Sequence, residues 1–449
     1  MSSALLRGLA LLLGCALLGA CSGRGDAPNV LIIVVDTLRR DHLGAYGYER
    51  RTSPEIDRLA ADAVRYDSAQ SQAPWTLPSV AALLTGRDVA ALGIGSDQDL
   101  LDDEFLLLSE VLSEQGFATG GIVSHKFVSA QWGFDQGFDS FDDSQALGHM
   151  AVTSPAVTEQ ALAFLDAHQE GKFFLFLHYF DPHFAYVEHE GFRFEATEPY
   201  EGWISSGTRF KKLMRAQDRL SAADLEEMRR LYDSEIAFTD HHIGRVLEGL
   251  QALGLFDETL IVVTADHGEE FFEHGQIGHG KTLYEELVGV PLIVRFPHGQ
   301  PGVLDQPVAL VDIFPTVLEL VGLEPGPELA GKSLLAAPDP ERIVFASTER
   351  RGGSRMARGP RLKLIRQLAT GPELYDLAAD PAERENLLDG AHAGAPPAPG
   401  LERLRDALEP YVAGIARSPQ RASRVELSRE QRQQLEELGY LSPAAESAP

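Results

Sequence analysis

Cysteine is almost absent from this chain of 449 residues. The only two cysteines are Cys15 and Cys21, and both lie within the first 21 residues. The part of the protein that follows therefore contains neither an internal disulfide nor a thiolate metal site.

Positive charge is also scarce. The chain has 39 Lys and Arg against 67 Asp and Glu, which gives a formal net charge of -28. Binding to a nucleic-acid backbone needs a dense basic surface, so this balance excludes nucleic acid as a partner. The apolar share of 44% and the charged share of 24% are those of a folded protein.

The apolar run at the N-terminus, Gly8 to Leu18, is too short to span a bilayer. Arg7 precedes it and Leu18-Gly19-Ala20-Cys21 follows it, which is typical of a secretory signal. The four residues that end in Cys21 resemble a bacterial lipobox, and an ordinary cleaved signal is the alternative. We expect a lipoprotein signal peptide over 1–21 and an exported protein attached to the cell envelope through lipidated Cys21. Ser22 indicates the outer membrane if the host is Gram-negative.

Buried β-branched runs alternate with helical patterns along most of the chain. The expected strands are Asn29 to Asp36, Ala118 to Val123, Lys172 to Tyr179, Thr259 to Ala265 and Val290 to Phe296. The expected helices are Ser53 to Ala63, Phe105 to Gln115, Thr158 to His168, Leu220 to Leu253 and Val311 to Val321. This alternation predicts an α/β fold with a large, doubly wound, mostly parallel sheet.

The sequence pattern changes after about residue 331, where we expect short strands followed by a helix from Leu401 to Ile415. We expect a smaller C-terminal α+β domain packed against the first, because one core rarely grows to this chain length. The expected divisions are a linker over 22–28, a large domain over 29–330, the smaller domain over 331–425, and a C-terminal helix and tail over 426–449.

The stretch from Trp75 to Gly86 reads as the start, body and end of an apolar helix. Pro78 fits the first helical turn and Gly86 ends the helix. The Thr76 hydroxyl then lies where backbone N–H groups and the helix dipole favour an anion. Thr76 is therefore a candidate nucleophile against phosphate or sulfate, with a helix cap as the alternative.

Candidate metal ligands stand at the ends of expected strands: Asp36 after the first, and Asp266-His267 after the fourth. The carboxyl edge of a parallel sheet is where α/β proteins bind ligands. Carboxylate oxygen together with imidazole nitrogen favours zinc or manganese, and calcium is the alternative. We expect one divalent metal ion.

Further histidines and lysines lie in the connecting loops. His279 could bind a second metal or protonate a leaving group, and Lys281 could hold an anionic oxygen. His183 and the pair His125-Lys126 are candidates for substrate contact. A solvated polar loop is the alternative for these residues.

Taken together, these motifs resemble the sulfatases of the alkaline phosphatase superfamily. The resemblance spans Asn29 to Leu388, with the motifs in the right order, and is specific as a set. The runs that carry it are Asn29 to Asp36, Trp75 to Gly86, Asp181-Pro182-His183, Asp266-His267-Gly268, His279-Gly280-Lys281, Leu283 to Glu286, Val290 to Ile293, and Leu374 to Leu377 in the smaller domain.

The resemblance implies an alkaline-phosphatase-like fold and a role for each matching position. Asp36, Asp266 and His267 fall on metal ligands, and Thr76 falls on the nucleophile. His183 and Lys281 fall on groups that contact the transferred anion, and His125 is a candidate for the same contact. The number of metals stays open, because two-metal members add an Asp and two His, and Asp240, His241, His242 and His279 do not clearly match that spacing.

The chain departs from the sulfatase pattern at the nucleophile. Sulfatases convert a Cys or Ser to formylglycine, which Thr76 cannot become, and the Arg expected four residues later is Val80. Thr37 stands where the pattern usually has a second Asp next to the first metal ligand. His267 stands where the pattern has Asn or His after Asp266.

These departures favour phosphorus chemistry, in which an unmodified Thr forms a phospho-threonine that is cleaved by water or passed to an alcohol. The sequence thus predicts a metal-dependent hydrolase or transferase of phosphoesters or phosphonate esters, acting on a small molecule, a lipid or a glycan. A sulfatase-fold binding or scaffold protein without turnover is the main alternative, and a sulfuric ester hydrolase is a weaker one.

Overall fold

The computed structural model describes residues 27–146, 152–196, 198–368, 370–390, 398–417, 422–428, 431–432 and 435. The expected signal peptide and Cys21 lie outside these ranges, as does most of the expected C-terminal helix and tail. Within the described residues, no helix combines the length and the apolar character needed to cross a membrane. Attachment through Cys21 and the domain boundaries stay predictions of the sequence.

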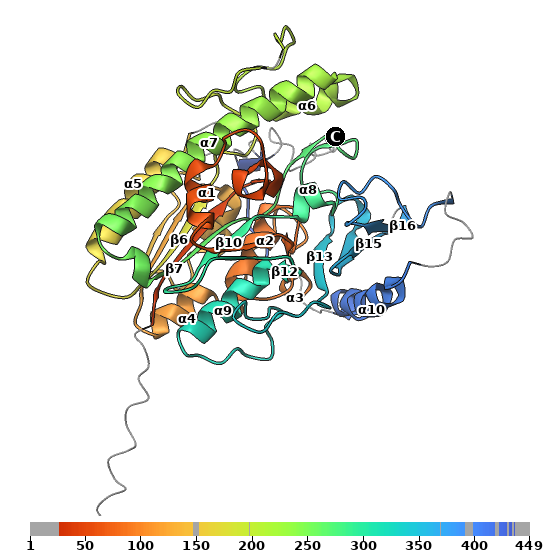
Figure 1. The fold of residues 1–449 in the computed structure, drawn as a ribbon. Coiled ribbons are helices and arrows are strands. Elements are labelled where there is room, and N and C mark those ends of the chain that lie inside the picture. The colour runs from red at the N-terminus through yellow and green to blue at the C-terminus, as the bar shows by residue number, and fades with distance from the viewer. Residues whose placement is uncertain are drawn as a thin grey trace, which may run out of the picture.

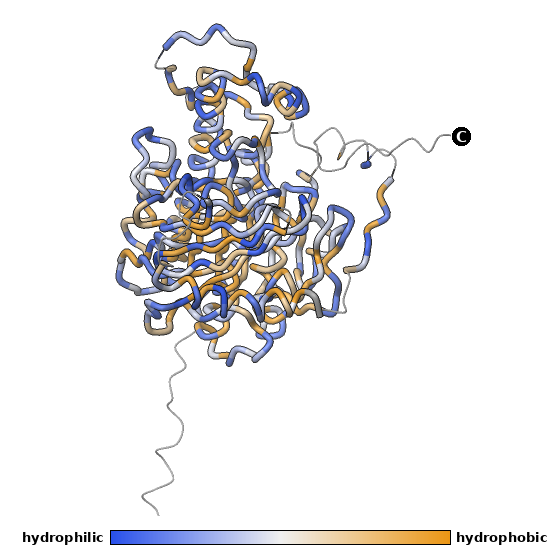
Figure 2. The backbone as a smooth tube through the Cα atoms, turned by 90° about the vertical axis from the view of Figure 1, so that its right-hand side faces the viewer, coloured by the Kyte–Doolittle hydropathy of each residue, from blue (hydrophilic) through white to orange (hydrophobic). Residues whose placement is uncertain are grey.

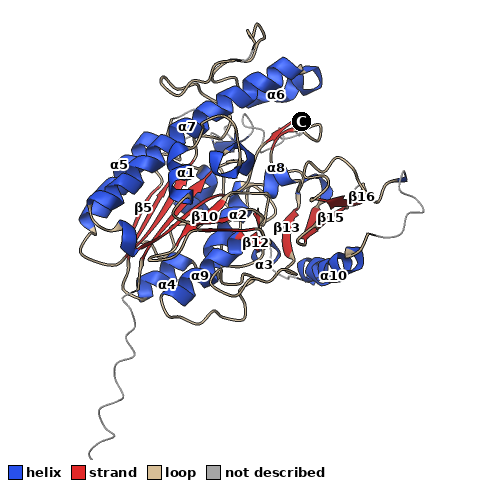
Figure 3. Ribbon diagram, viewed as in Figure 1, coloured by secondary structure: helices blue, strands red, loops and turns tan. Residues whose placement is uncertain are grey.

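An eight-stranded sheet forms the centre of the molecule (Figures 1 and 3). Its strand order is β11 (Gly302–Leu304), β2 (Val64–Tyr66), β10 (Leu292–Arg295), β7 (Thr259–Ala265), β1 (Asn29–Val35), β6 (Phe173–Tyr179), β4 (Ala118–Val123) and β5 (Ser140–Asp142). The run from β7 to β5 is parallel, and this confirms the expected mostly parallel α/β sheet.

Strand β10 is antiparallel to both of its neighbours, β7 and β2. The sequence predicted this strand but gave no sign of its direction. Because β10 runs back from the edge where β7 ends, the connection 266–291 begins and ends at the carboxyl edge of the sheet. That topology keeps the histidine-rich loop near Asp36.

The strands β1, β6 and β7 are buried along their whole length because helices cover both faces of the sheet. Figure 2 shows this as hydrophobic backbone concentrated at the centre. One face carries α1 (Pro54–Ala60), α5 (Ser154–Ala167) and α7 (Ala222–Ala252). The other carries α2 (Thr76–Thr85), α4 (Leu108–Glu114) and α9 (Ile313–Leu320).

A second, antiparallel sheet follows in the C-terminal part. It consists of β13 (Val344–Thr348), β14 (Ser354–Arg358), β15 (Leu362–Gln367) and β16 (Gly371–Asp376), and α10 (Leu401–Arg417) packs on it. The other face of this sheet packs against residues next to α8 (Glu285–Val288), through a cluster that includes Tyr284, Met356 and Tyr375. The smaller α+β region that the sequence predicted is therefore present.

Helix α5 begins four residues before the expected Thr158. The carboxylate of Asp181 accepts hydrogen bonds from the N–H groups of Thr153 and Ser154, both at 2.7 Å, and so caps the helix. A cap that comes from a distant loop leaves no local signal in the sequence. Asp181 is thus a structural cap.

Candidate functional site

The carboxylates of Asp36 and Asp266 meet at the carboxyl edge of the central sheet. Asp36 follows β1, Asp266 follows its parallel neighbour β7, and both are fully buried. The Oδ1 atom of Asp266 accepts the N–H groups of His267 at 2.9 Å and Thr37 at 3.3 Å. In the described part of the chain, neither oxygen of Asp36 nor Oδ2 of Asp266 has a hydrogen-bond partner. Three buried carboxylate oxygens therefore face one another without a donor.

Burial raises the pKa of Asp36 well above its usual value, and the nearby charges of Asp266 and Glu269 raise it further. Burial also acts to raise the pKa of Asp266, but the charges of His267 and His178 outweigh burial and lower it. A site of this kind calls for a positive charge close to Asp36.

The residues present fit a divalent metal ion. Asp36, Asp266 and His267 each offer one ligand atom, and these atoms lie within 4.8 Å of one another. The Nδ1 atom of His267 lies 2.9 Å from the carbonyl oxygen of Gly268, so it carries the proton and leaves Nε2 with a lone pair. Two carboxylates with one imidazole form a donor set that binds divalent metal ions.

Helix α2 begins at Thr76, and its N-cap residue is Trp75. Thr76 is thus the first helical residue and does not occupy the N-cap position, and the side chain of Trp75 makes no capping hydrogen bond. Instead, Thr76 Oγ1 lies 3.2 Å from Nε2 of His267. The Ser79 hydroxyl donates to the carbonyl oxygen of Asp266 at 2.6 Å, which ties the first turn of α2 to the end of β7.

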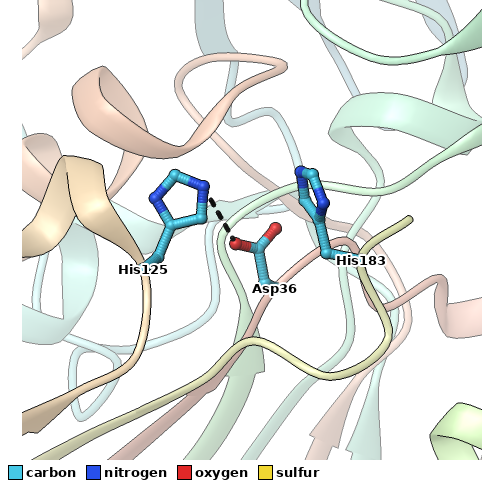
Figure 4. A group of neighbouring side chains, drawn as sticks. All are labelled: Asp36, His125 and His183. Carbon is cyan, nitrogen blue, oxygen red and sulfur yellow. Dashed lines mark ion pairs between the residues drawn. The ribbon is translucent and has the colours of Figure 1, made fainter. Parts of the chain in front are cut away.

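Figure 4 shows His125 and His183 on either side of Asp36. His125 Nε2 lies 3.9 Å from Asp36 Oδ2, while its Nδ1 accepts the N–H of Phe127 at 3.0 Å. A ring that accepts at Nδ1 carries its proton on Nε2, so His125 presents a donor to the site. His183 is the opposite case, because its Nδ1 lies 3.0 Å from the carbonyl oxygen of Phe184, which leaves Nε2 as an acceptor.

His279 is held by a carboxylate that the sequence reasoning missed. Its Nδ1 lies 3.0 Å from Oε1 of Glu269, and the Tyr186 hydroxyl donates to Oε2 at 2.9 Å. The His279 ring lies 4.5 Å from that of His267 and 4.9 Å from that of His183. Burial and the neighbouring His267 lower the pKa of His279 well below its usual value. A neutral, oriented imidazole of this kind is suited to proton transfer. The only local signal for Glu269 was its place next to Asp266-His267-Gly268.

Lys281, Arg350 and Lys126 differ in their contacts near the site. Lys281 is half-buried, and burial together with nearby Arg351 lowers its pKa. Arg350, also missed by the sequence reasoning, comes from the turn between β13 and β14, and its guanidinium carbon lies 4.1 Å from the centre of the Trp75 ring. Lys126 Nζ lies 5.6 Å from the centre of the Trp132 ring, and no described contact brings it to the carboxylates.

The acidic and histidine residues of α7 do not join the site. Asp240 accepts the N–H groups of Glu55 and Ile56 and so caps α1. Within the described ranges, the two groups of side chains that could hold a metal both contain Asp36, and neither contains Asp240, His241 or His242. Of the three positions that the sequence left open, Asp240 is therefore a helix cap, and His241 and His242 lie on α7 outside both groups.

Comparisons with known proteins identify the family of this chain. The sulfatase family model matches residues 28–323. The uncharacterized sulfatase YidJ of Escherichia coli (strain K12) is 25% identical over 442 residues, covering 86% of this chain and 88% of YidJ. A structure bound to its substrate D-glucosamine-2-N,6-O-disulfate superimposes with a TM-score of 0.72 at 19% identity and covers 88% of this chain and 99% of its own. The phosphonate monoester hydrolase of Agrobacterium radiobacter gives a TM-score of 0.70 at 21% identity, covering 87% of this chain and 96% of that one. Since the family model spans well over half of its length, this chain belongs to the sulfatase family of ester hydrolases, within the alkaline phosphatase superfamily.

Proposed function

We propose that this protein is a metal-dependent hydrolase or transferase of phosphoesters or phosphonate esters, with Thr76 as its nucleophile. The observation that carries the proposal is the hydroxyl of Thr76, a residue outside the N-cap position, which lies 3.2 Å from Nε2 of His267. A divalent ion held by Asp36, Asp266 and His267 would supply the positive charge that favours an alkoxide and polarises the ester.

The other residues bind the anion and handle protons. Backbone N–H groups in the first turn of α2 face the position of an anion beside Thr76. His183, Lys281 and His125 are the proposed contacts to the transferred group, since His183 and His125 flank Asp36 and Lys281 follows His279 in the same loop.

In the reaction, the Thr76 oxygen bonds to phosphorus while the bond to the leaving oxygen breaks. We assign the transfer of the hydroxyl proton to the leaving oxygen to His279, which Glu269 holds in place. Water or an acceptor alcohol then displaces the Thr76 oxygen from phosphorus, and its proton returns to Thr76.

Phosphorus is favoured over sulfur because of the chemistry of Thr76. A sulfo-threonine is a stable ester, and its hydrolysis must break a second strong bond. Among proteins of similar fold, one is bound to a sulfated sugar and another is a phosphonate monoester hydrolase, so the fold accommodates both ester groups.

The test compares an aryl phosphodiester, an aryl phosphonate ester and an aryl sulfate as substrates for the zinc- or manganese-loaded protein. We expect one of the phosphorus esters to react at least about 10-fold faster than the sulfate, and Thr76→Ala to lower kcat by about 1,000-fold or more. Thr76→Ser keeps a hydroxyl and is the matched control, with a smaller loss.

Equal residual rates for the wild type and Thr76→Ala would refute the nucleophile assignment. Metal binding without turnover of any of the three esters would favour the scaffold alternative. Added glycerol separates the two reaction types, because a transferase yields a glycerol phosphoester and a hydrolase yields the free acid.

A further inference from the structure

His178 is a buried imidazole that lies on the central sheet itself. It belongs to β6, where it pairs with Val34 of β1 and Val123 of β4, and it is fully buried. Neither ring nitrogen has a hydrogen-bond partner in the part of the chain that the structure describes. The sequence reasoning treated His178 as one more residue of a buried strand.

The Nε2 atom of His178 points at the two carboxylates of the site. It lies 3.8 Å from Oδ2 of Asp266 and 4.0 Å from Oδ2 of Asp36. Both distances are too long for a hydrogen bond. The two distances suit ligand atoms that share one metal ion. Zinc binds imidazole nitrogen and carboxylate oxygen at about 2.0–2.2 Å, so small shifts of the side chains would bring all three groups to bonding distance.

The other site imidazoles show why His178 is unusual. The Nδ1 atoms of His267, His279 and His183 each lie about 3 Å from a carbonyl or carboxylate oxygen. Burial of an imidazole with no partner at either nitrogen is costly, so a residue of this kind in a functional site points to a missing ligand.

Thr37 supplies the second part of the argument. In the sulfatase pattern this position carries a further carboxylate, and Thr37 offers none. Its backbone is instead in the left-handed region with φ 54°, which is strained for a β-branched residue, and its N–H donates to Asp266. Thr37 therefore brings no second carboxylate beside Asp36, and His178 on the adjacent strand β6 faces the carboxylates of Asp36 and Asp266.

We propose that His178 is a fourth protein ligand of the divalent ion, beside Asp36, Asp266 and His267. This proposal rests on the metal site of the proposed function but not on its reaction. Two carboxylates balance a divalent charge, and two imidazoles would each bind through a nitrogen lone pair; this mixed donor set favours zinc or manganese over calcium. The competing role is that of a fixed imidazolium that neutralises the carboxylates without touching the metal.

X-ray absorption of the full chain loaded with zinc tests the proposal, because imidazole ligands are counted from their scattering. We expect two imidazoles per zinc in the wild type and one in His178→Gln. The Kd for zinc should rise by at least about 100-fold in His178→Gln, the upper end for losing a group that merely supports a ligand.

Two control variants separate this proposal from other effects. His242→Gln removes another buried imidazole with an unpaired Nδ1, on α7, and should leave the imidazole count and the Kd unchanged. Thr76→Ala should keep both imidazoles, whether or not turnover is lost, so failure of the proposed reaction does not affect the readout.

A single imidazole per zinc in the wild type would overturn the proposal, and this measurement needs no variant to fold. An unchanged Kd in folded His178→Gln would overturn it as well and would favour the imidazolium role.

Discussion

Two clusters of buried charge in this molecule differ in how their carboxylates are neutralised. Where the two sheets meet, Glu285 lies 2.7 Å from Arg40 and 3.0 Å from Lys363, and Lys363 also lies 3.0 Å from Glu383. At the site, the ring nitrogens closest to Asp36 stand 3.7 to 4.0 Å away. The carboxylates of both clusters are buried, so burial does not account for the difference.

The two clusters differ in which positive charge stabilises their carboxylates. Burial acts to raise the pKa of Glu285, but the charges of Lys363 and Arg40 outweigh it and lower the pKa. The pKa of Asp36 stays raised, because the causes that act on it, burial and the charges of Asp266 and Glu269, all raise it. The interface uses the ammonium group of the chain itself, whereas the site leaves room for an ion from solution.

The largest expected effect comes from breaking the interface cluster. Lys363→Met removes the shared ammonium and leaves two buried carboxylates with too little positive charge. We expect the free energy of unfolding to fall by about 3–5 kcal/mol, measured by urea denaturation at pH 7.5.

Arg366→Met is the matched control, because Arg366 lies on the same strand in a partly exposed ion pair with Glu409 at 2.8 Å. Its expected change is within about 0.5 kcal/mol. If the free energy of unfolding falls by similar amounts in the two variants, the buried cluster contributes no more to stability than the exposed ion pair.

The next effect is a pH dependence at Glu383. Burial raises the pKa of Glu383 to about 7, although nearby Lys363 lowers it. The folded state therefore binds more protons than the unfolded state between about pH 4.5 and pH 7. The stability from this carboxyl group is complete below that window and is lost as the pH rises through it.

Glu383→Gln mimics the protonated carboxyl group and isolates this contribution. Relative to the wild type, the variant should gain on the order of 2 kcal/mol in unfolding free energy between pH 5 and pH 8. A difference that stays constant over this range would show that Glu383 does not titrate there.

The smallest expected effect has the opposite sign and sharpens the comparison. Asp36→Asn removes a buried carboxylate whose oxygens have no hydrogen-bond partner among the described residues. In the presence of a chelator, we expect the variant to be more stable than the wild type by about 1 kcal/mol at pH 7.5. Zinc should raise the melting temperature of the wild type and leave that of the variant unchanged. If the variant is less stable than the wild type in the absence of metal, the charge of Asp36 is stabilised by the protein itself, and this interpretation is wrong.

The acidic residues after buried strands show how much of the site the sequence pattern predicts. Asp36, Asp181 and Asp266 all occur at or just beyond the ends of such strands, and the pattern correctly places them at the carboxyl edge. The structure makes Asp181 a helix cap, because Thr153 and Ser154 bring their N–H groups to it from 28 and 27 residues away. The local sequence pattern does not distinguish an aspartate that caps a helix from one that binds a ligand. The difference depends on which group far along the chain comes to lie next to the carboxylate.

The histidines show the same limit. His267 stood out in sequence because it follows Asp266 at a strand end. His178 lies in the run Phe173 to Tyr179, where nothing in the sequence distinguishes it from a packing residue. Only the register of β6 against β1 brings its ring to both carboxylates.

The sequence by itself determined the order of the five longer strands of the central sheet, but it gave no sign of the short strands β2, β5 and β11. It also determined that an apolar helix lies next to Thr76, at which edge the candidate ligands lie, and the resemblance to sulfatases. These features follow from patterns within a few residues of one another. The tertiary structure decided which acids are left without donors, which nitrogen each imidazole offers, and that Arg350 of the second sheet reaches Trp75. Each of these depends on distances between atoms that lie far apart along the chain, and such distances are fixed only when the two sheets and their helices pack.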